Sequence, residues 1–326
     1  YAFKQPLINS KGKQTTLCYV FLNTIKRLID SYSPKYFAVM FDSGKAIKRM
    51  EIYKEYKANR KKMPDEMFEQ FEDLKEMINK LNIPIYEKEG VEADDILAKT
   101  ALEGQNRNIK TYILTSDKDM AQIINDNIQI LRPVKGNENE QHFGYLEVFQ
   151  KFGVYPEQIV DYLSIVGDSS DNIPGVKGVG EKGAVKLLSE YKNLDNIYVN
   201  INNIKPESLK KKLIENKEQA YLAKQLIKLD LDIDFDLSWN HLIFHGFDKD
   251  KVIDVLKYLE FNSMIHHFRF QTSFNFQYEI IDTEKKLLVL IEKLTKSAEI
   301  AIDIESDHLD PFQARLVGIS LCVEKN

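Results

Sequence analysis

Several features typical of other protein classes are absent from this chain of 326 residues. It has no run of 18 apolar residues, which argues against a membrane span, and its first residues lack the charged and apolar regions of a signal peptide. Cys18 and Cys322 lie at opposite ends and form neither a metal-binding spacing nor a disulfide framework. The six histidines are scattered, so a zinc site or a catalytic triad has little support. The cysteine usage favours a reducing compartment, the cytoplasm.

The net charge of −5 disfavours a polyanionic partner at first sight, but the charges are unevenly distributed. Between Lys45 and Lys62 the basic residues far outnumber the acidic ones, and local field matters more than total charge for steering nucleic acid. Within YKEYKANRKK, Lys57 and Arg60 are one helical turn apart and could clamp a phosphate, while Tyr56 could stack on an unpaired base. The alternative is an ordinary solvated helix.

The chain is long enough for two domains. Alternating strand and helix patterns up to about residue 145 predict an α/β fold, with a mostly parallel sheet and helices on both faces. The expected strands are 36–41, 83–86, 111–114 and 128–131, and the expected helices are 16–29, 66–81 and 94–103. Further helices are expected at 146–152, 156–166, 182–191, 206–229 and 249–259. After a linker at 271–277, a new α/β pattern begins, with a strand at 278–281, a helix at 284–296, and strands at 299–304 and 316–323.

Acidic residues gather in four groups that follow strands, turns or helix starts. They are Asp42 in FDS, Glu92, Asp94 and Asp95 in EADD, Asp117 and Asp119 in TSDKD, and Asp168 and Asp171 in GDSSD. Each group alone has an ordinary explanation as a turn, a helix cap or a complement to a helix N-terminus. Crowded carboxylates repel one another unless divalent cations neutralise them. Together the groups predict a site for two Mg²⁺ or Mn²⁺ ions and phosphodiester hydrolysis, with Asp117 among the catalytic residues.

The glycine-rich segment NIPGVKGVGEKGAVKLL predicts a tight turn that leads into a helix. Backbone amides at such a turn bind anions, and neighbouring lysines reinforce the attraction. This is the pattern of a helix-hairpin-helix, which grips the DNA backbone without reading sequence. The residues expected to contact DNA are Gly175, Lys177, Gly178, Gly180 and Lys182. The alternative is a purely structural glycine turn.

These motifs closely resemble the 5′-nuclease, flap endonuclease-like domain of bacterial DNA polymerase I. The resemblance covers residues 1 to about 270 and rests on FDS, YKANR, EADD, TSDKD, GDSSDNIPGVKGVGEK and LEFNSMIHHF in that order. It implies a PIN-like core at 1–145, a helical arch at about 46–64 and a helical DNA-binding subdomain at 146–270. It also implies metal binding by all eight acidic residues, phosphate contact by the catalytic residues Lys57 and Arg60 beside Tyr56, and a potassium ion at the hairpin.

Residues 278–326 resemble the opening of the 3′-5′ exonuclease domain of the same polymerase, an RNase H-like α/β fragment. Asp303 and Glu305 match the Asp-x-Glu of its metal site. A piece this short predicts no proofreading, and a polymerase domain is expected in the parent chain. The family begins with a strand that carries a metal-binding Asp, which would precede Tyr1, so we expect truncation at both ends. Gly183 also departs from the family, which usually has a small β-branched or polar residue there.

The resemblance predicts a monomeric, structure-selective 5′-3′ exonuclease and flap endonuclease that hydrolyses DNA in primer removal and repair. Its expected substrates are 5′ flaps, nicked or gapped duplexes and 5′ ends, and its expected location is the cytoplasm, at the bacterial nucleoid, with no membrane partner. Two alternatives stay open. One is a non-catalytic duplex-DNA-binding fragment, because the first metal-binding Asp is missing. The other is a PIN-type ribonuclease, which would share the fold but act on RNA.

Overall fold

The structure is a computed structural model that describes residues 6–60, 65–133, 140–235, 237–268, 279–297, 299–308 and 313–323. Contacts within the chain divide it into two compact units, Tyr1–Arg269 and Phe270–Asn326. The predicted linker at 271–277 lies outside the described residues. None of the helices in the described ranges combines the length and the apolar character needed to cross a membrane.

Two small sheets make up the β structure of the larger unit. Their strands are β1 (Val39–Met40), β2 (Ile85–Tyr86), β3 (Thr111–Leu114), β4 (Ile128–Arg132) and β5 (Gln141–Phe143). The parallel pairs β1–β2 and β3–β4 agree with the prediction, whereas β5 was not predicted and joins β4 in antiparallel. Within the described residues no ladder joins the two sheets. β1 is shorter than predicted because the residues before it pair elsewhere: Tyr36 bridges to Ile243, and the Phe37 N–H donates to the Leu242 carbonyl at 2.8 Å.

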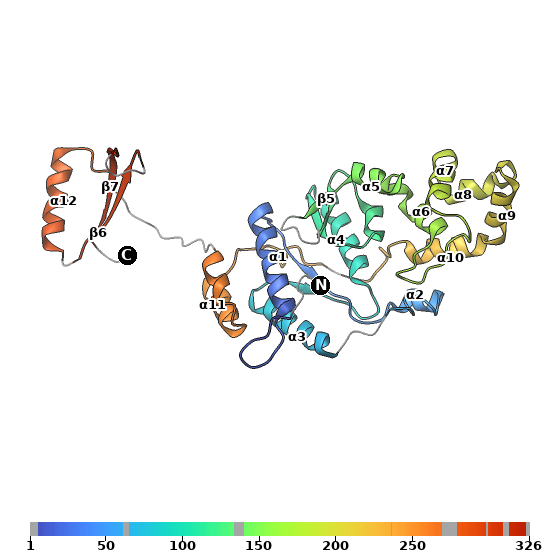
Figure 1. Ribbon diagram of the computed structural model, residues 1–326, viewed down its shortest axis with the longest axis horizontal. Coiled ribbons are helices and arrows are strands. Elements are labelled where there is room, and N and C mark those ends of the chain that lie inside the picture. The colour runs from blue at the N-terminus through green and yellow to red at the C-terminus, as the bar shows by residue number, and fades with distance from the viewer. Residues whose placement is uncertain are drawn as a thin grey trace. The chain divides into compact units, whose positions relative to one another are not determined.

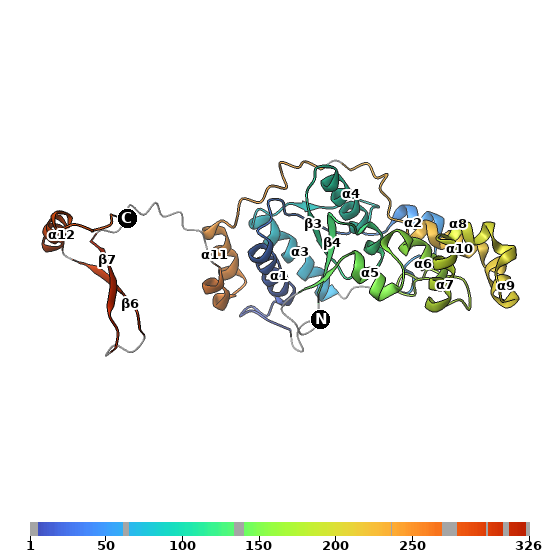
Figure 2. The same cartoon turned by 90° about the horizontal axis from the view of Figure 1, so that it is seen from above.

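Helices pack around these sheets and build an all-helical part of the larger unit (Figures 1 and 2). In chain order they are α1 (Thr16–Tyr32), α2 (Ile47–Ile52), α3 (Asp65–Lys80), α4 (Ala93–Asn106), α5 (Tyr145–Phe152), α6 (Ile159–Val166), α7 (Glu181–Tyr191), α8 (Leu194–Val199), α9 (Glu207–Glu215), α10 (Lys217–Ile227) and α11 (Lys249–Tyr258), with 3-10 helices η1 (Asp119–Ile123), η2 (Pro156–Gln158), η3 (Ile201–Asn203) and η4 (Asn262–His267). α1 packs on α3, α3 packs on α11, and α6 contacts both α7 and α10.

The core of the helical part explains where the site lies. α6 is almost entirely buried, because apolar residues occupy nearly all of its positions, and it packs between α7 and α10. α1 instead buries one stripe, formed by Cys18, Leu22, Ile25 and Leu28 at helical spacing. A helix buried on all sides cannot shift without opening the core. The turn that follows α6, which carries two of the predicted acidic residues, is therefore held in a fixed position.

Two predicted helices are wrong in extent. The helix expected at 206–229 is two helices, α9 and α10, because the Asn216 side chain donates to the Lys212 carbonyl at 2.8 Å and the backbone leaves helical geometry there. The helix of the expected arch stops at Ile52, and turns follow to Arg60, with Lys57 in the left-handed region at φ 55°. The rest of the expected arch lies outside the described residues.

The smaller unit consists of α12 (Glu284–Lys296), β6 (Ala301–Ser306) and β7 (Leu316–Cys322), with β6 and β7 antiparallel. The strand predicted at 278–281 is not formed: residues 279–281 have no strand geometry, and residue 278 lies outside the described range. The apolar residues of the hairpin are largely exposed, at 64% for Ile302, 61% for Ile304 and 70% for Val317. A two-stranded sheet that buries so little apolar surface has little stability of its own.

Candidate metal centre and nucleic-acid interface

The first two acidic groups meet at the start of α4. Asp42 follows β1, and its Oδ1 accepts a hydrogen bond from the Ala93 N–H at 2.7 Å. This contact satisfies one of the free amides at the helix start and ties the end of β1 to EADD. Asp94 lies in the first turn of α4, so the strand-end rule correctly brought Asp42 close to this group.

The third group is shaped by a turn after β3. The Asp117 N–H donates to Thr115 Oγ1 at 3.0 Å, and the Asp119 N–H donates to Asp117 Oδ1 at 2.8 Å. These local bonds turn the chain from β3 into η1. The Asp119 Oδ1 atom is buried and has no hydrogen-bond partner. A buried carboxylate oxygen without a donor is costly, which is the condition that a bound cation would relieve.

The fourth group lies on the turn after α6. Asp168 and Ile173 exchange backbone hydrogen bonds at 2.9 and 2.7 Å, which close the loop that carries Asp171. Carboxylate oxygens of Asp119, Asp168 and Asp171 lie within 4.8 Å of one another. Two residues from this turn and one from η1 therefore converge on a volume that one ion could occupy, while the predicted site with two ions and eight acidic residues stays a prediction.

The electrostatics join the four groups into one acidic centre. Burial raises the pKa of Asp94 to about 7, reinforced by Asp117, Asp42 and Glu92. Burial also raises the pKa of Asp119 to about 8, reinforced by Asp117, Asp168 and Asp171. Asp117 contributes to both shifts, and its Oδ1 accepts the hydrogen bond from the Asp119 N–H. Oxygen ligands on separate, locally fixed turns fit divalent cations such as Mg²⁺ and Mn²⁺. We call Asp42, Glu92, Asp94, Asp117, Asp119, Asp168 and Asp171 the acidic centre.

This arrangement predicts how the stability of the metal-free chain depends on pH. Because Asp94 and Asp119 have raised pKa values in the folded state, the folded chain holds more protons than the unfolded chain between about pH 4 and pH 8. The free energy of unfolding in EDTA should therefore fall, by several kcal/mol in order of magnitude, as the pH rises through that window. Urea unfolding at a series of pH values measures this. Saturating Mg²⁺ should flatten the fall, and an identical fall with and without Mg²⁺ would contradict the prediction.

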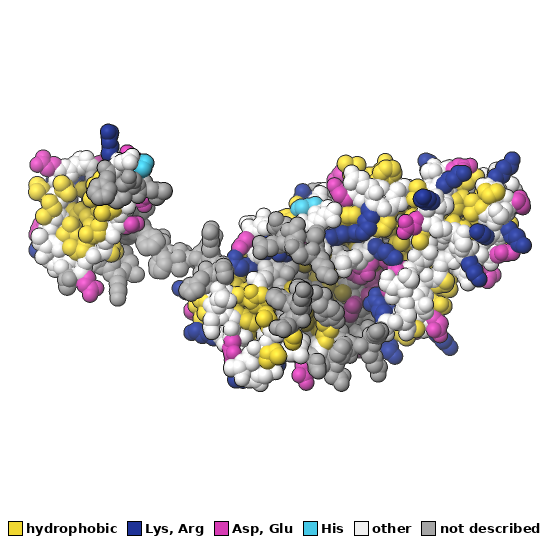
Figure 3. Space-filling view, in the orientation of Figure 1, with side chains coloured by type: hydrophobic (Ala, Val, Ile, Leu, Met, Phe, Trp, Pro, Cys, Tyr) yellow, Lys and Arg dark blue, Asp and Glu magenta, His cyan; other side chains and the backbone are white. Residues whose placement is uncertain are grey.

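Basic residues of the arch segment lie against the acidic centre. Lys57 Nζ is hydrogen-bonded to Glu92 and lies 3.6 Å from Asp171 Oδ2, while Arg60 Nη2 donates to Asp171 Oδ1 at 2.5 Å. On the face of the larger unit in Figure 3, Lys and Arg side chains lie beside Asp and Glu side chains. Lys57 and Arg60 thus meet the acids from a turn, and the prediction that they share a helix is wrong.

The ring of Tyr56 is not exposed at the surface, as stacking on a base would require. Its side chain is buried, and its hydroxyl donates to Glu92 Oε2 at 3.1 Å and lies 3.3 Å from Asp171 Oδ2. The ring is therefore unavailable to an unpaired base in this structure. Tyr56 instead holds two carboxylates from opposite halves of the acidic centre.

Asp95 does not join the acidic centre. Arg49 Nη1 and Nη2 donate to its two oxygens at 2.7 and 2.8 Å, and the Asp230 N–H donates to Oδ1 at 2.8 Å. Both oxygens are thus occupied, and the side chain is 2% exposed. In this structure Asp95 anchors Arg49, and its metal-binding role stays a prediction. Arg49 also donates to Glu92 Oε2 at 2.6 Å, a role that the sequence analysis missed.

The hairpin between α6 and α7 has the predicted form. The Val176 N–H donates to the Ile165 carbonyl at 2.7 Å, Gly178 has φ 77°, and Gly180 precedes the first residue of α7. Lys177 and Lys182 are exposed, as is Lys186. The Gly178 carbonyl accepts a hydrogen bond from Lys212 Nζ at 2.9 Å. A protein ammonium group therefore already contacts the hairpin where a potassium ion was predicted.

Gly175 allows a backbone contact that no other residue permits. A Cβ at this position would lie 2.4 Å from the Gly167 amide nitrogen and 2.5 Å from the Ile165 carbonyl oxygen. Since these are backbone atoms of the fixed turn and of the buried helix α6, Gly175→Ala should lower the free energy of unfolding by about 3 kcal/mol. Gly180→Ala is the matched control, because its Cβ would meet nothing within 4 Å, and it should cost at most about 1 kcal/mol. Equal losses in urea unfolding would contradict this account.

Comparison with known proteins agrees with the geometry. Residues 1–153 match the family described as 5′-3′ exonuclease, N-terminal resolvase-like domain, and residues 154–250 match 5′-3′ exonuclease, C-terminal SAM fold. A 5′-3′ exonuclease of Aquifex aeolicus is 36% identical over 260 residues, which cover 80% of this chain and 87% of that protein. The chain belongs to the 5′-3′ exonuclease family. The predicted family is confirmed.

Two further proteins resemble this member of the 5′-3′ exonuclease family, one in sequence and one in structure. The DNA polymerase I of Borreliella burgdorferi is 36% identical over 344 residues, which cover 97% of this chain but only 38% of that protein. A bacteriophage T5 flap endonuclease, solved in a complex with DNA and metal ions, matches 82% of this chain and 93% of its own with a TM-score of 0.57 and 22% identity. The structural likeness confirms the predicted fold class, a PIN-like α/β core with a helical subdomain.

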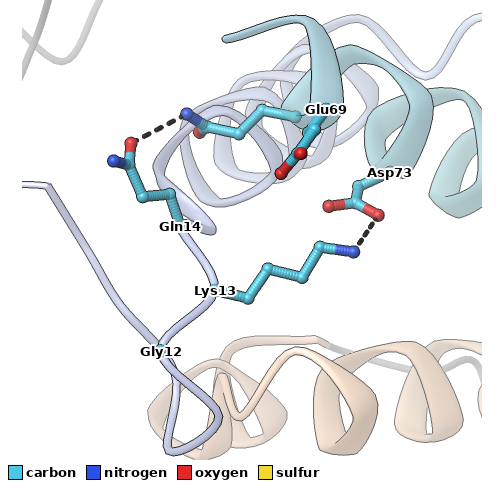
Figure 4. Close-up of a pocket in the computed structure, with 6 residues that line it drawn as sticks. Gly12, Lys13, Gln14, Glu69 and Asp73 are labelled. Carbon is cyan, nitrogen blue, oxygen red and sulfur yellow. Dashed lines mark hydrogen bonds and ion pairs between the residues drawn. The ribbon is translucent and has the colours of Figure 1, made fainter. Parts of the chain in front are cut away.

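Two other features do not form part of the acidic centre. Asp303 and Glu305 lie two residues apart on β6, so they share one face of the hairpin, but no third acidic residue of the described chain joins them in a cluster. Their metal-binding role stays a prediction. A polar pocket of about 260 Å³ lies between residues 12–14 and α3 (Figure 4). Two of its charged side chains form an ion pair, with Lys13 Nζ 2.5 Å from Asp73 Oδ1.

Proposed function

We propose that this chain is a divalent-metal-dependent, structure-selective 5′-3′ nuclease that hydrolyses DNA phosphodiesters at 5′ flaps, nicks, gaps and 5′ ends. The observation that supports this most strongly is the convergence of Asp119, Asp168 and Asp171 within 4.8 Å, at the foot of a hairpin with exposed lysines. The relatives named DNA polymerase I suggest a parent chain with a polymerase domain, and a role in primer removal and repair. We further propose that the protein acts as a monomer in the cytoplasm.

The acidic centre would hold two Mg²⁺ or Mn²⁺ ions, which would supply an activated water and a counter-charge for the leaving oxygen. In the metal-free chain, Lys57 and Arg60 neutralise Glu92 and Asp171. Once cations compensate these carboxylates, the two basic side chains are free to turn to the scissile phosphate, where Arg60 can donate two parallel hydrogen bonds. The hairpin would hold the downstream duplex by its backbone. A potassium ion at the hairpin of residues 175–180 stays part of the proposal.

The test is a cleavage assay on a labelled 5′-flap duplex with Mg²⁺, with EDTA as the control. We expect cutting at the flap junction that depends on Mg²⁺. Duplex binding without cutting would support the non-catalytic alternative for this chain. Equal cutting of single-stranded RNA and flap DNA would support the ribonuclease alternative and contradict our proposal.

The hairpin lysines make a separate prediction. Lys182 lies in the first turn of α7 and is exposed, so a contact with a phosphate there would be electrostatic and independent of sequence. Lys182→Ala should weaken binding to all duplex sequences alike and reduce the slope of log Kd against log salt by about one. Fluorescence anisotropy over a salt series measures both. Lys249→Ala, an exposed lysine on α11, is the matched control, and a sequence-dependent loss for Lys182→Ala would contradict the backbone role.

A further inference from the structure

Arg132 at the end of β4 is a buried cation, and two of its nitrogens have no acceptor in the described part of the chain. Its side chain is 9% exposed, and its Nε and Nη2 atoms are buried without a hydrogen-bond partner. The guanidinium carbon lies 3.6 Å from the centroid of the Phe143 ring, so the group is fixed by stacking. Buried guanidinium N–H groups almost always have acceptors, which makes these two donors an exception that requires a partner.

Lys151 on α5 brings a second positive charge to the same ring. Its Nζ lies 5.7 Å from the centroid of Phe143 and 5.4 Å from that of Phe152. Within the described part of the chain, no carboxylate forms an ion pair with Lys151 or Arg132. The pKa of Lys151 is lowered, first by the partial burial of its ammonium group and then by the charges of Arg132 and Lys118. Two cations that face one ring repel each other, and a bound anion would relieve this repulsion.

The position of these cations relates them to the acidic centre. Lys118 Nζ lies 2.8 Å from Asp168 Oδ1, and Lys118 also acts on Lys151. The Thr115 N–H donates to the Leu131 carbonyl at 3.1 Å, which holds the end of β4, with Arg132, beside the turn that carries Asp117. The cations therefore border the acidic centre on the side of β4 and α5. Arg60 and Lys57 approach it from the arch segment instead, so the two basic groups are separate.

We propose that Arg132 and Lys151 form an oxyanion subsite for a phosphate of the DNA strand that passes the acidic centre. This rests on the proposed function. A planar guanidinium with two free N–H donors matches the oxygens of a phosphodiester, and the nearby ammonium adds charge. Lys151 is exposed, so it is the first of the two cations that the phosphate meets. The free donors of Arg132 are buried, so the Arg132 side chain has to move before the phosphate can contact them. The subsite fixes the strand and contributes no metal ligand.

The test uses a series of flap duplexes, each with one neutral methylphosphonate linkage in place of a phosphate at a different position in either strand. The Kd of each duplex is measured by fluorescence anisotropy in EDTA. For the unaltered chain, one or two positions should weaken binding about tenfold, the effect of a charge-assisted hydrogen bond. In Lys151→Met and Arg132→Lys, the same positions should cost about twofold or less, since the partner of that phosphate is already weakened. Lys249→Met is the control and should keep the full effect. Thermal unfolding verifies that each variant is folded.

Equal methylphosphonate costs in all variants at every position would overturn the proposal. A parallel titration with inorganic phosphate distinguishes the source of the anion: stabilisation of the unaltered chain that is lost in Lys151→Met supports an oxyanion site. The same stabilisation without any methylphosphonate effect would overturn the assignment to a DNA strand. Because binding in EDTA requires no cutting, a chain that fails to cleave DNA can still pass this test. A chain that cleaves DNA can likewise fail it.

Discussion

Replacement of Asp119 by Asn should lower the single-turnover rate of flap cleavage about a thousandfold or more, while the Kd for duplex DNA changes by less than about twofold. Asp119 supplies one of the three converging oxygens, and its Oδ1 has no other partner in the fold. The hairpin that is proposed to hold the duplex does not depend on this side chain. Chemistry and binding should therefore separate in this variant.

The same variant carries a second, opposite readout. In EDTA at about pH 8.5, Asp119→Asn should be more stable than the unaltered chain, because it removes a buried charge that Asp117, Asp168 and Asp171 repel. Added Mg²⁺ should stabilise the unaltered chain strongly and the variant only weakly. Asp254→Asn, an exposed residue on α11, is the matched control and should change neither quantity. Retained cleavage, or a loss of duplex binding that equals the loss of cleavage, would contradict the metal-centre assignment.

The sequence predicted the convergence of the acidic groups because it depends on a simple rule. Carboxyl ends of parallel strands share an edge, which predicted that Asp42 and Asp117 lie at one side of the fold, although β1 and β3 belong to separate sheets in the described residues. The fixed turn after α6 added Asp168 and Asp171, whose Gly167–Gly175 contact is encoded by two glycines. Where local hydrogen bonds set the backbone geometry, residue types and their spacing were sufficient to predict where the acidic residues lie.

The errors have a different physical origin. Asp94 and Asp95 are adjacent on α4, so their side chains point about 100° apart, and only the packing of α4 decides which one faces the acidic centre. Tyr56 could equally be exposed or buried, since its ring suits stacking and its hydroxyl suits a carboxylate. Tyr36 left its predicted strand for a partner more than 200 residues away, at Ile243. Such choices depend on tertiary contacts that local patterns do not contain.

Arg49 makes the side-chain contacts whose loss should destabilise the chain most. It donates to Asp95 through two hydrogen bonds, to Glu92 Oε2 at 2.6 Å and to the Leu226 carbonyl at 2.9 Å. The side chain thus joins α2, the start of α4 and the end of α10. Arg49→Met would leave Asp95 buried and unpaired, so the free energy of unfolding should fall by about 3–5 kcal/mol in urea unfolding. The control is Lys48→Met, at the residue before Arg49, which removes an ion pair with Asp230 at the surface. It should lower the free energy of unfolding by less than about 1 kcal/mol.

A double variant separates stability from positioning. In Arg49→Met with Asp95→Asn, no buried charge is left unpaired, and the Asn oxygen can still accept from the Asp230 N–H, so most of the lost stability should return. Glu92 nevertheless lacks the guanidinium that fixes its Oε2, while Lys57 and Tyr56 still hold it on the other side. Flap cleavage should therefore stay about tenfold below the unaltered chain at saturating DNA, and a higher Mg²⁺ concentration should recover part of it. Cleavage that returns fully with stability would mean that Arg49 acts on the fold alone.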